Sequence, residues 1–263
     1  MKTPNIRILV GLILLAGCKA TDEPKPISLE DKTLSELYQV LNSDLHQPED
    51  SLIQIRHYYS EEGEVDRTQD YYYDRTGKQA LVVAKTAHAD TLGMSIFKYD
   101  ESGKLTQRIN FTKQDGLTAW DSSVEYVYNS ENLETEIYHL RPPMSKSLLA
   151  QKVYNPSNQL IEVRFGTEAY VYDYNEQGLT ATEKWILLDS PSQPLNIFFY
   201  RYDSLDRLIA KEVYVNADIP KREDAFQYDY NESGKLKEER EFETRFGYSL
   251  KERKEFVYQI PND

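Results

Sequence analysis

A five-residue phrase recurs along most of this 263-residue chain and restricts it to repeated β-hairpins. Each phrase begins with Tyr, continues with Asp or Asn, and has Gly, Asn or Asp at its fifth position. Successive phrases lie 20–29 residues apart, a spacing typical of a repeat array. The first, second and fifth residues of the seven complete phrases are Tyr73, Asp74 and Gly77; Tyr99, Asp100 and Gly103; Tyr128, Asn129 and Asn132; Tyr154, Asn155 and Asn158; Tyr174, Asn175 and Gly178; Tyr202, Asp203 and Asp206; and Tyr230, Asn231 and Gly234.

Each position of the phrase suits a tight turn between two strands. An Asp or Asn side chain can accept hydrogen bonds from the N–H groups of the turn. Gly, Asn and Asp are the residues that most easily adopt a positive φ. A Leu usually follows, and alternation places aromatic residues on one face of the preceding strand, as at Phe198, Tyr200 and Tyr202. The phrases therefore predict hairpin turns with a structural role, and Tyr258 begins an eighth phrase.

The opposite ends of the expected hairpins are irregular and often contain Pro or Gly. These segments are residues 114–120, 141–146, 190–195 and 216–221. Variable loops on a rigid frame are common sites of recognition. We therefore predict one regular sheet edge and one edge of variable loops.

Residues 51–263 are predicted to form a mainly β domain, an antiparallel hairpin meander that is a curled single sheet or is partly closed. The repeated Tyr, Asp or Asn, turn and Leu resemble the YD-repeat (RHS-type) β-ribbon family over about four-fifths of the chain. The resemblance implies an architecture of stacked antiparallel hairpins. The shell and toxin functions of large family members are not carried over.

Residues 1–17 have the form of a lipoprotein signal peptide, with a short basic start and an apolar run too short to span a bilayer. The run ends at Leu15-Ala16-Gly17-Cys18, which resembles the bacterial lipobox and implies lipidation of Cys18. The alternatives are an ordinary signal peptide or a buried free Cys. Lys19 follows the Cys where an Asp would imply retention in the inner membrane, so we expect an outer-membrane lipid anchor facing the periplasm or the cell surface. Residues 19–23 loosely resemble the export signal of Bacteroidota surface lipoproteins, which implies display on the cell surface.

Residues 18–50 are predicted to form a tether and an amphipathic helix. The apolar residues of segment 29–45 recur at helical spacing, at Leu34, Leu37, Tyr38, Leu41 and Leu45. Such a helix either packs over the sheet or binds a partner.

Charge and composition exclude several functions. A net charge of −13 disfavours nucleic acid as a partner, and a single Cys excludes an internal disulfide. His46, His57, His88 and His139 lack paired metal-ligand spacing. The chain has no sequence signature of a catalytic site, so we expect no enzyme activity, cofactor or metal.

Aromatic residues are the candidate ligand-binding residues, namely Tyr71, Tyr72, Trp120 and Trp185. Their flat rings suit stacking on sugars, although they could instead cover a thin core. The sequence thus predicts an envelope-anchored, non-catalytic binding or scaffold module for a glycan or protein. The alternatives are a polysaccharide hydrolase with paired carboxylates, among which Glu61, Glu62, Glu64 and Asp66 cluster, or a structural spacer.

Overall fold

The computed structural model describes residues 45, 47–49, 51–59, 63–114, 117–141, 145–215, 221–243 and 249–259. These residues form sixteen antiparallel strands and, within the described ranges, no helix. The strands are β1 (Leu52–Tyr58), β2 (Arg67–Tyr73), β3 (Gln79–Thr86), β4 (Thr91–Tyr99), β5 (Leu105–Gln114), β6 (Leu117–Tyr128), β7 (Glu134–Arg141), β8 (Ser145–Tyr154), β9 (Leu160–Phe165), β10 (Glu168–Tyr174), β11 (Thr180–Leu187), β12 (Asn196–Tyr202), β13 (Leu208–Val215), β14 (Lys221–Tyr230), β15 (Leu236–Glu243) and β16 (Ser249–Tyr258).

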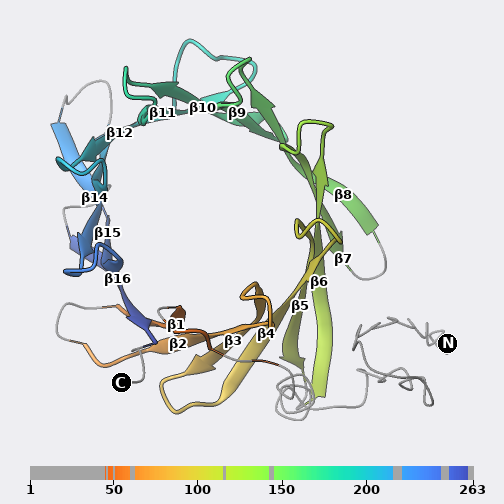
Figure 1. The fold of residues 1–263 in the computed structure, drawn as a ribbon. Helices are drawn as coiled ribbons and strands as arrows, with labels where there is room; N and C mark the ends of the chain where they lie inside the picture. The colour runs from red at the N-terminus through yellow and green to blue at the C-terminus, as the bar shows by residue number, and fades with distance from the viewer. Residues whose placement is uncertain are drawn as a thin grey trace, which may run out of the picture.

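Every strand pairs with its neighbours in sequence, and β1 pairs with β16, so the sheet closes into a barrel. Figure 1 views this barrel along its axis, with the first and last strands side by side. The prediction of a curled or partly closed sheet with an N-terminal helix was therefore wrong. The physical reason is that β1 and β2 form a further hairpin before the first phrase, which brings β1 beside β16 and leaves no free edge.

The helix predicted over residues 29–45 lies outside the described residues except at its last position. Leu45 has no regular secondary structure and packs against an apolar cluster on β3–β5. No helix in the described ranges is long and apolar enough to cross a membrane.

Seven tight turns, one for each phrase, lie at one end of the barrel, which we call the tight rim. The Asx side chain at the second position accepts hydrogen bonds within its own turn. In the turn of Asn155, its Oδ1 accepts the N–H groups of Ser157 and Gln159 at 3.0 and 2.9 Å. The fifth residue has a positive φ in all seven turns: Gly77, Gly103, Asn132, Asn158, Gly178, Asp206 and Gly234.

The eight remaining connections lie at the opposite end, the variable rim. They differ in length: β9 and β10 are joined by residues 166–167, whereas β11 and β12 are joined by residues 188–195. The four predicted loop segments map to this rim, with parts of three of them outside the described residues.

Candidate functional site

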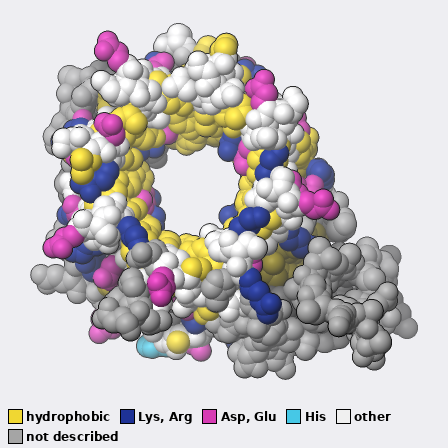
Figure 2. Space-filling model, viewed as in Figure 1, with side chains coloured by type: hydrophobic (Ala, Val, Ile, Leu, Met, Phe, Trp, Pro, Cys, Tyr) yellow, Lys and Arg dark blue, Asp and Glu magenta, His cyan; other side chains and the backbone are white. Residues whose placement is uncertain are grey.

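The two faces of the barrel wall differ in chemistry. Figure 2 shows an open lumen whose wall is formed largely by hydrophobic side chains, a class that includes Tyr in this view. Alternation along each strand separates these residues from outward-facing residues. On the outward face, Asp173 pairs with Lys184 at 2.8 Å, and Arg201 pairs with Glu212 at 3.2 Å. The barrel thus presents charge outside and aromatic side chains inside.

One outward region is apolar rather than charged. It comprises Leu81, Val83, Met94, Ile109 and Phe111 on β3–β5, and Leu81 and Val83 are only 1% and 0% exposed. This outer cluster is a structural core. It is distinct from the lumen.

Two rings of side chains, all aromatic except Lys152, lie in the lumen near the tight rim. The first ring contains the Tyr that ends each even-numbered strand: Tyr73, Tyr99, Tyr128, Tyr154, Tyr174, Tyr202, Tyr230 and Tyr258. The second ring contains the residues two positions earlier: Tyr71, Phe97, Tyr126, Lys152, Tyr172, Tyr200, Tyr228 and Phe256. A single strand face holds both members of each pair because side chains alternate with period two.

The first ring is held by a repeated hydrogen bond. Each tyrosine hydroxyl donates to a backbone carbonyl at the start of the preceding strand, as Tyr202 does to Thr180 at 2.9 Å and Tyr258 does to Leu236 at 2.9 Å. In four hairpins a cation from the preceding turn also stacks on the ring, as Lys235 does on Tyr258 at 5.2 Å from the ring centroid. These tyrosines are fixed in position and line the lumen as a rigid collar.

Deeper in the lumen, an ion pair is embedded among aromatic side chains. Lys211 on β13 places its Nζ 3.1 Å from both carboxylate oxygens of Glu183 on β11. Tyr200 on β12 donates its hydroxyl to Glu183 at 2.5 Å. Glu183 is only 7% exposed, so its charge depends on these two partners.

Three rings surround the ammonium group of this ion pair. The centroids of Phe198, Tyr200 and Phe226 lie 4.3, 5.2 and 5.8 Å from Lys211 Nζ. Such cation–π contacts stabilise a partly desolvated cation. We call Glu183, Tyr200, Lys211, Phe198 and Phe226 the lumen anchor.

Further tyrosines face the same carboxylate. Burial raises the pKa of Tyr172 and Tyr228, and the negative charge of Glu183 raises both further. Burial, followed by the hydrogen bond to Glu183, also raises the pKa of Tyr200. These phenols therefore remain neutral donors and acceptors at physiological pH.

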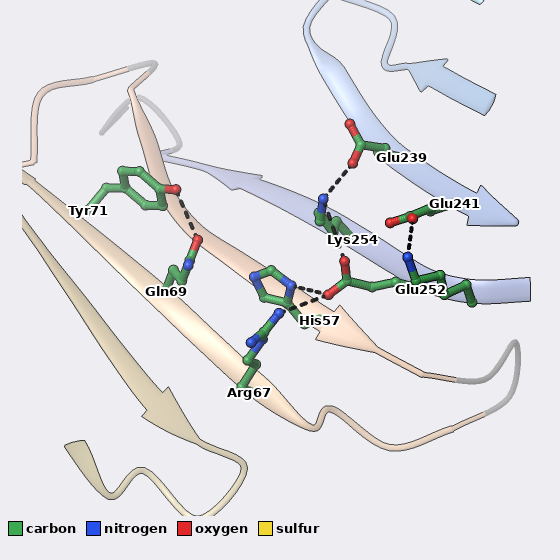
Figure 3. Close-up of polar contacts among 9 residues, drawn as sticks. His57, Arg67, Gln69, Tyr71, Glu239, Glu241, Glu252 and Lys254 are labelled. Atoms are coloured by element: carbon green, nitrogen blue, oxygen red, sulfur yellow. Dashed lines mark hydrogen bonds and ion pairs between the residues drawn. The ribbon is translucent and has the colours of Figure 1, made fainter. Parts of the chain in front are cut away.

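A second polar cluster lies where β1 meets β16, and Figure 3 shows its contacts. His57 Nδ1 lies 2.7 Å from Glu252 Oε1, which Arg67 also contacts at 3.2 Å. Lys254 bridges Glu252 and Glu239 at 3.6 and 2.6 Å. We call these five residues the seam cluster, since they join the first two strands to the last two.

The four predicted ligand-binding residues do not form one cluster. Tyr71 and Trp185 face the lumen, where Trp185 Nε1 donates to Glu168 at 2.9 Å and its ring lies 6.2 Å from that of Tyr170. Tyr72 and Trp120 instead pack against the outer cluster. Adjacent residues point to opposite faces of a strand, which separates Tyr72 from Tyr71.

Sequence reasoning missed the lumen anchor. The alternating pattern of Phe198 and Tyr200 was visible in the sequence, but Glu183 and Lys211 resemble ordinary surface charges. Pairing of the four consecutive strands β11–β14 brings these residues together. Among the described residues, no group of His, Cys, Asp and Glu side chains is arranged to hold a metal ion.

Known proteins show distant structural likeness to this chain. No family model and no curated protein matches it. Two solved structures of Tc toxins, the holotoxin pore of Photorhabdus luminescens and TcdB2–TccC3 without its hypervariable C-terminal region, are each 12% identical, with TM-scores of 0.35 and 0.34. They match over 80% and 82% of this chain, which spans only 14% and 15% of the length of those chains.

A porin-like protein from Bacteroides uniformis matches over 82% of this chain and 100% of its own length, at 9% identity and a TM-score of 0.49. Likenesses at these identities and TM-scores assign no function to the chain.

Proposed function

We propose that this protein is an envelope-anchored, non-catalytic barrel that binds a glycan or a protein segment in its lumen. The observation that carries the proposal is an open lumen with a largely hydrophobic wall (Figure 2), to which the rings of Tyr and Phe side chains described above contribute. Contiguous apolar surface that remains open to solvent usually marks an interaction site. Tyr and Trp are effective in such sites because their rings supply contact area while their polar atoms bond to neighbours.

The outer wall supports a barrel that stands in water beside the membrane. Outward ion pairs such as Asp173–Lys184 and Glu162–Arg164 occur on β9–β11. A basic side chain facing lipid at the centre of a bilayer costs about 2–4 kcal/mol. We assign attachment to the lipobox at Cys18 instead, where two or three acyl chains would give a stable anchor.

Lipid attachment has a direct test in the native host. Labelled palmitate should be incorporated by the native chain and lost in Cys18→Ser. Labelling of that variant would contradict the anchor.

The hydrolase alternative gains no specific support from the lumen carboxylates. Glu183 bonds Lys211, Glu239 bonds Lys254, and Glu252 bonds His57 and Arg67. Each of these three carboxylates is thus engaged with a basic side chain, which suits a structural or binding role.

The two tryptophans allow lumen binding to be tested directly. The chain has only Trp120 and Trp185, and they lie on opposite faces of the barrel wall. In Trp120→Phe, the remaining fluorescence comes from the lumen. In Trp185→Phe, it comes from the outer cluster and serves as the matched control.

The expected result is that a bound oligosaccharide or extended peptide changes the fluorescence of Trp120→Phe and leaves that of Trp185→Phe unchanged. Equal responses of both variants would place binding outside the lumen. No response of Trp120→Phe to either class of probe would contradict the proposed function.

A further inference from the structure

We propose that the lumen anchor is a subsite for a neutral oligosaccharide. This inference rests on the proposed function, and it names both the ligand class and the residues that recognise it. A binding site of this kind needs a mostly apolar lining and a few fixed polar groups that orient the ligand. The Glu183–Lys211 pair supplies the fixed polar groups, and the surrounding rings supply the lining.

The polar groups have hydrogen-bonding capacity left for a ligand. An ammonium group has three N–H donors, and the bonds from Lys211 to the two oxygens of Glu183 use two of them. A carboxylate has about four acceptor sites, and Tyr200 and Lys211 together donate three bonds to Glu183. A sugar hydroxyl both donates and accepts, so it matches this pair better than a purely apolar ligand does.

The aromatic surface extends on both sides of the pair. Phe198 and Phe226 flank Lys211. In the other direction the rings of Trp185, Tyr170 and Phe165 follow one another, with centroid distances of 6.2 and 5.0 Å. A run of rings beside a polar pair fits a chain of sugar units, each with apolar C–H faces and a rim of hydroxyls.

Charge favours a neutral ligand over an acidic one. The positive charge of Lys211 is neutralised by Glu183, and Lys254 and Arg67 are likewise paired with Glu239 and Glu252. The whole chain carries −13. An acidic polysaccharide would therefore meet no unpaired cation at the anchor and would be repelled by the net charge of the chain.

Closure of the sheet disfavours an extended peptide. Peptides commonly bind β-proteins by adding a strand to a free sheet edge. Because β1 pairs with β16, the described barrel presents no such edge. A peptide would have to rely on side-chain contacts alone, whereas a sugar chain needs only rings and hydroxyl partners.

The test compares a lumen variant with a matched outer variant in the Trp120→Phe background. The lumen variant is Glu183→Gln with Lys211→Met, which removes both charges together and leaves no unpaired buried ion. The control is Asp173→Asn with Lys184→Met, since Lys184 follows Glu183 on β11 and points outward. Near-ultraviolet circular dichroism checks that both variants are folded.

A third variant, Tyr200→Phe, keeps the ring and both charges and removes only the hydroxyl bonded to Glu183. It keeps the inference testable if the lumen double variant does not fold. The probes are a neutral glucose heptasaccharide, an oligogalacturonate of equal length and an unstructured neutral peptide, each titrated against the fluorescence of Trp185.

We expect the neutral heptasaccharide to bind, with affinity at least about tenfold weaker in the lumen double variant, weaker in Tyr200→Phe, and unchanged in the outer control. Equal sugar affinity in the lumen and outer variants would refute the subsite and leave lumen binding intact. Binding of the peptide or the oligogalacturonate without the neutral sugar would refute the ligand class. If none of the three probes changed the Trp185 signal, the proposed function itself would fail.

Discussion

At the scale of single residues, the fifth position of each tight turn shows how local chemistry shapes this barrel. Six of the seven turns have Gly or Asn at this position; for example, Gly234 and Gly178 have φ of 81° and 80°, and Asn132 and Asn158 have φ of 67° and 61°. A side chain beyond Gly, Asn or Asp is strained in this region because its Cβ approaches the carbonyl oxygen. The turns could therefore be predicted from residue type alone.

Replacing Gly234 tests whether the turn requires a residue that readily adopts a positive φ. Gly234→Ala should lower the free energy of unfolding by about 1 kcal/mol, because Ala is strained at a positive φ. A Cβ at this position would have ordinary room, with Arg207 Nη1 at 3.9 Å, so the cost comes from the backbone. Urea denaturation followed by circular dichroism gives the measurement.

Gly234→Asn is the matched control, since the same chain places Asn at this position in two other turns. It should be less destabilised than Gly234→Ala. An Ala variant as stable as the native protein would show that the turn does not require a positive φ.

The partners of the first-ring tyrosines were not predictable at the residue scale. A Tyr at each strand end was evident, but its hydroxyl bonds a carbonyl 14–23 residues earlier in the chain. The length of each variable-rim loop and the strand register set that partner. The Tyr, Asp or Asn, and Gly of the phrase thus predict the turn, while the collar follows from strand pairing.

At the scale of elements, the alternation of side chains predicted which face of a strand each residue occupies. It did not predict the β-bulges that interrupt this alternation. Tyr170 and Tyr172 lie on the same face of β10, as the sequence indicated. Bulges shift the register inside several strands, as between Asn110 and Phe111 on β5. A bulge adds a residue to one strand without a strong sequence signal, and it decides which later side chains enter the lumen.

The seam cluster adds side-chain contacts to the pairing of β1 with β16, and the acid sensitivity of these contacts follows from Glu252. Burial alone would raise the pKa of Glu252, but the hydrogen bond with His57 and the charge of Lys254 outweigh burial and hold this pKa below its ordinary value. The unfolded chain therefore binds a proton at this carboxylate at a higher pH than the folded barrel does. The stability that it contributes is present above the unfolded value, about 4.3, and is lost as the pH falls through the folded value.

Comparison of the native protein with Glu252→Gln should isolate this contribution. We expect the native protein to be more stable at pH 7, with the difference shrinking as the pH falls from about 5 to about 2. Equilibrium unfolding at a series of pH values provides the measurement. The acidic turn residues Asp74, Asp100 and Asp203 also have lowered pKa values, so both proteins should still lose stability in acid. A difference independent of pH would contradict the role assigned to Glu252.

At the scale of the whole molecule, closure is the feature that local sequence could not predict. The segment 52–58 precedes the first phrase, so no tight turn marks it as a strand of the array. Pairing of β1 with β16 requires all sixteen strands to form one sheet that curves until its two edges meet. The closed lumen and its complete rings exist only because β1 pairs with β16, whereas the lumen anchor is built by the consecutive strands β11–β14.

Closure of the barrel also explains why the four candidate ligand-binding residues lie in two different environments. Tyr71 and Trp185 were chosen for their aromatic rings and lie inside the barrel, whereas Tyr72 and Trp120 were chosen on the same grounds and lie outside. In an open sheet, either face could bind a ligand. In a closed barrel, one face is a shared lumen and the other is the outer surface, so the same residue type has two roles.

A disulfide across the β1–β16 seam is the most direct test of this account. Arg56 and Glu255 are Cα partners on the outward face of the seam. Facing residues in an antiparallel pair lie about 4.5–5.5 Å apart, within the range that a disulfide can bridge. Arg56→Cys with Glu255→Cys, in a Cys18→Ser background, should form an intramolecular disulfide under mild oxidation of the native protein.

Arg56→Cys with Glu238→Cys is the control, because Glu238 faces Glu255 from the next strand and lies two strands from Arg56. At about 9–10 Å that pair is too far apart to form a disulfide. We expect a mobility shift on a non-reducing gel for the first pair and none for the second. If the first pair stayed reduced in the folded protein, the sheet would be open at this seam and the lumen on which the binding proposals rest would not exist.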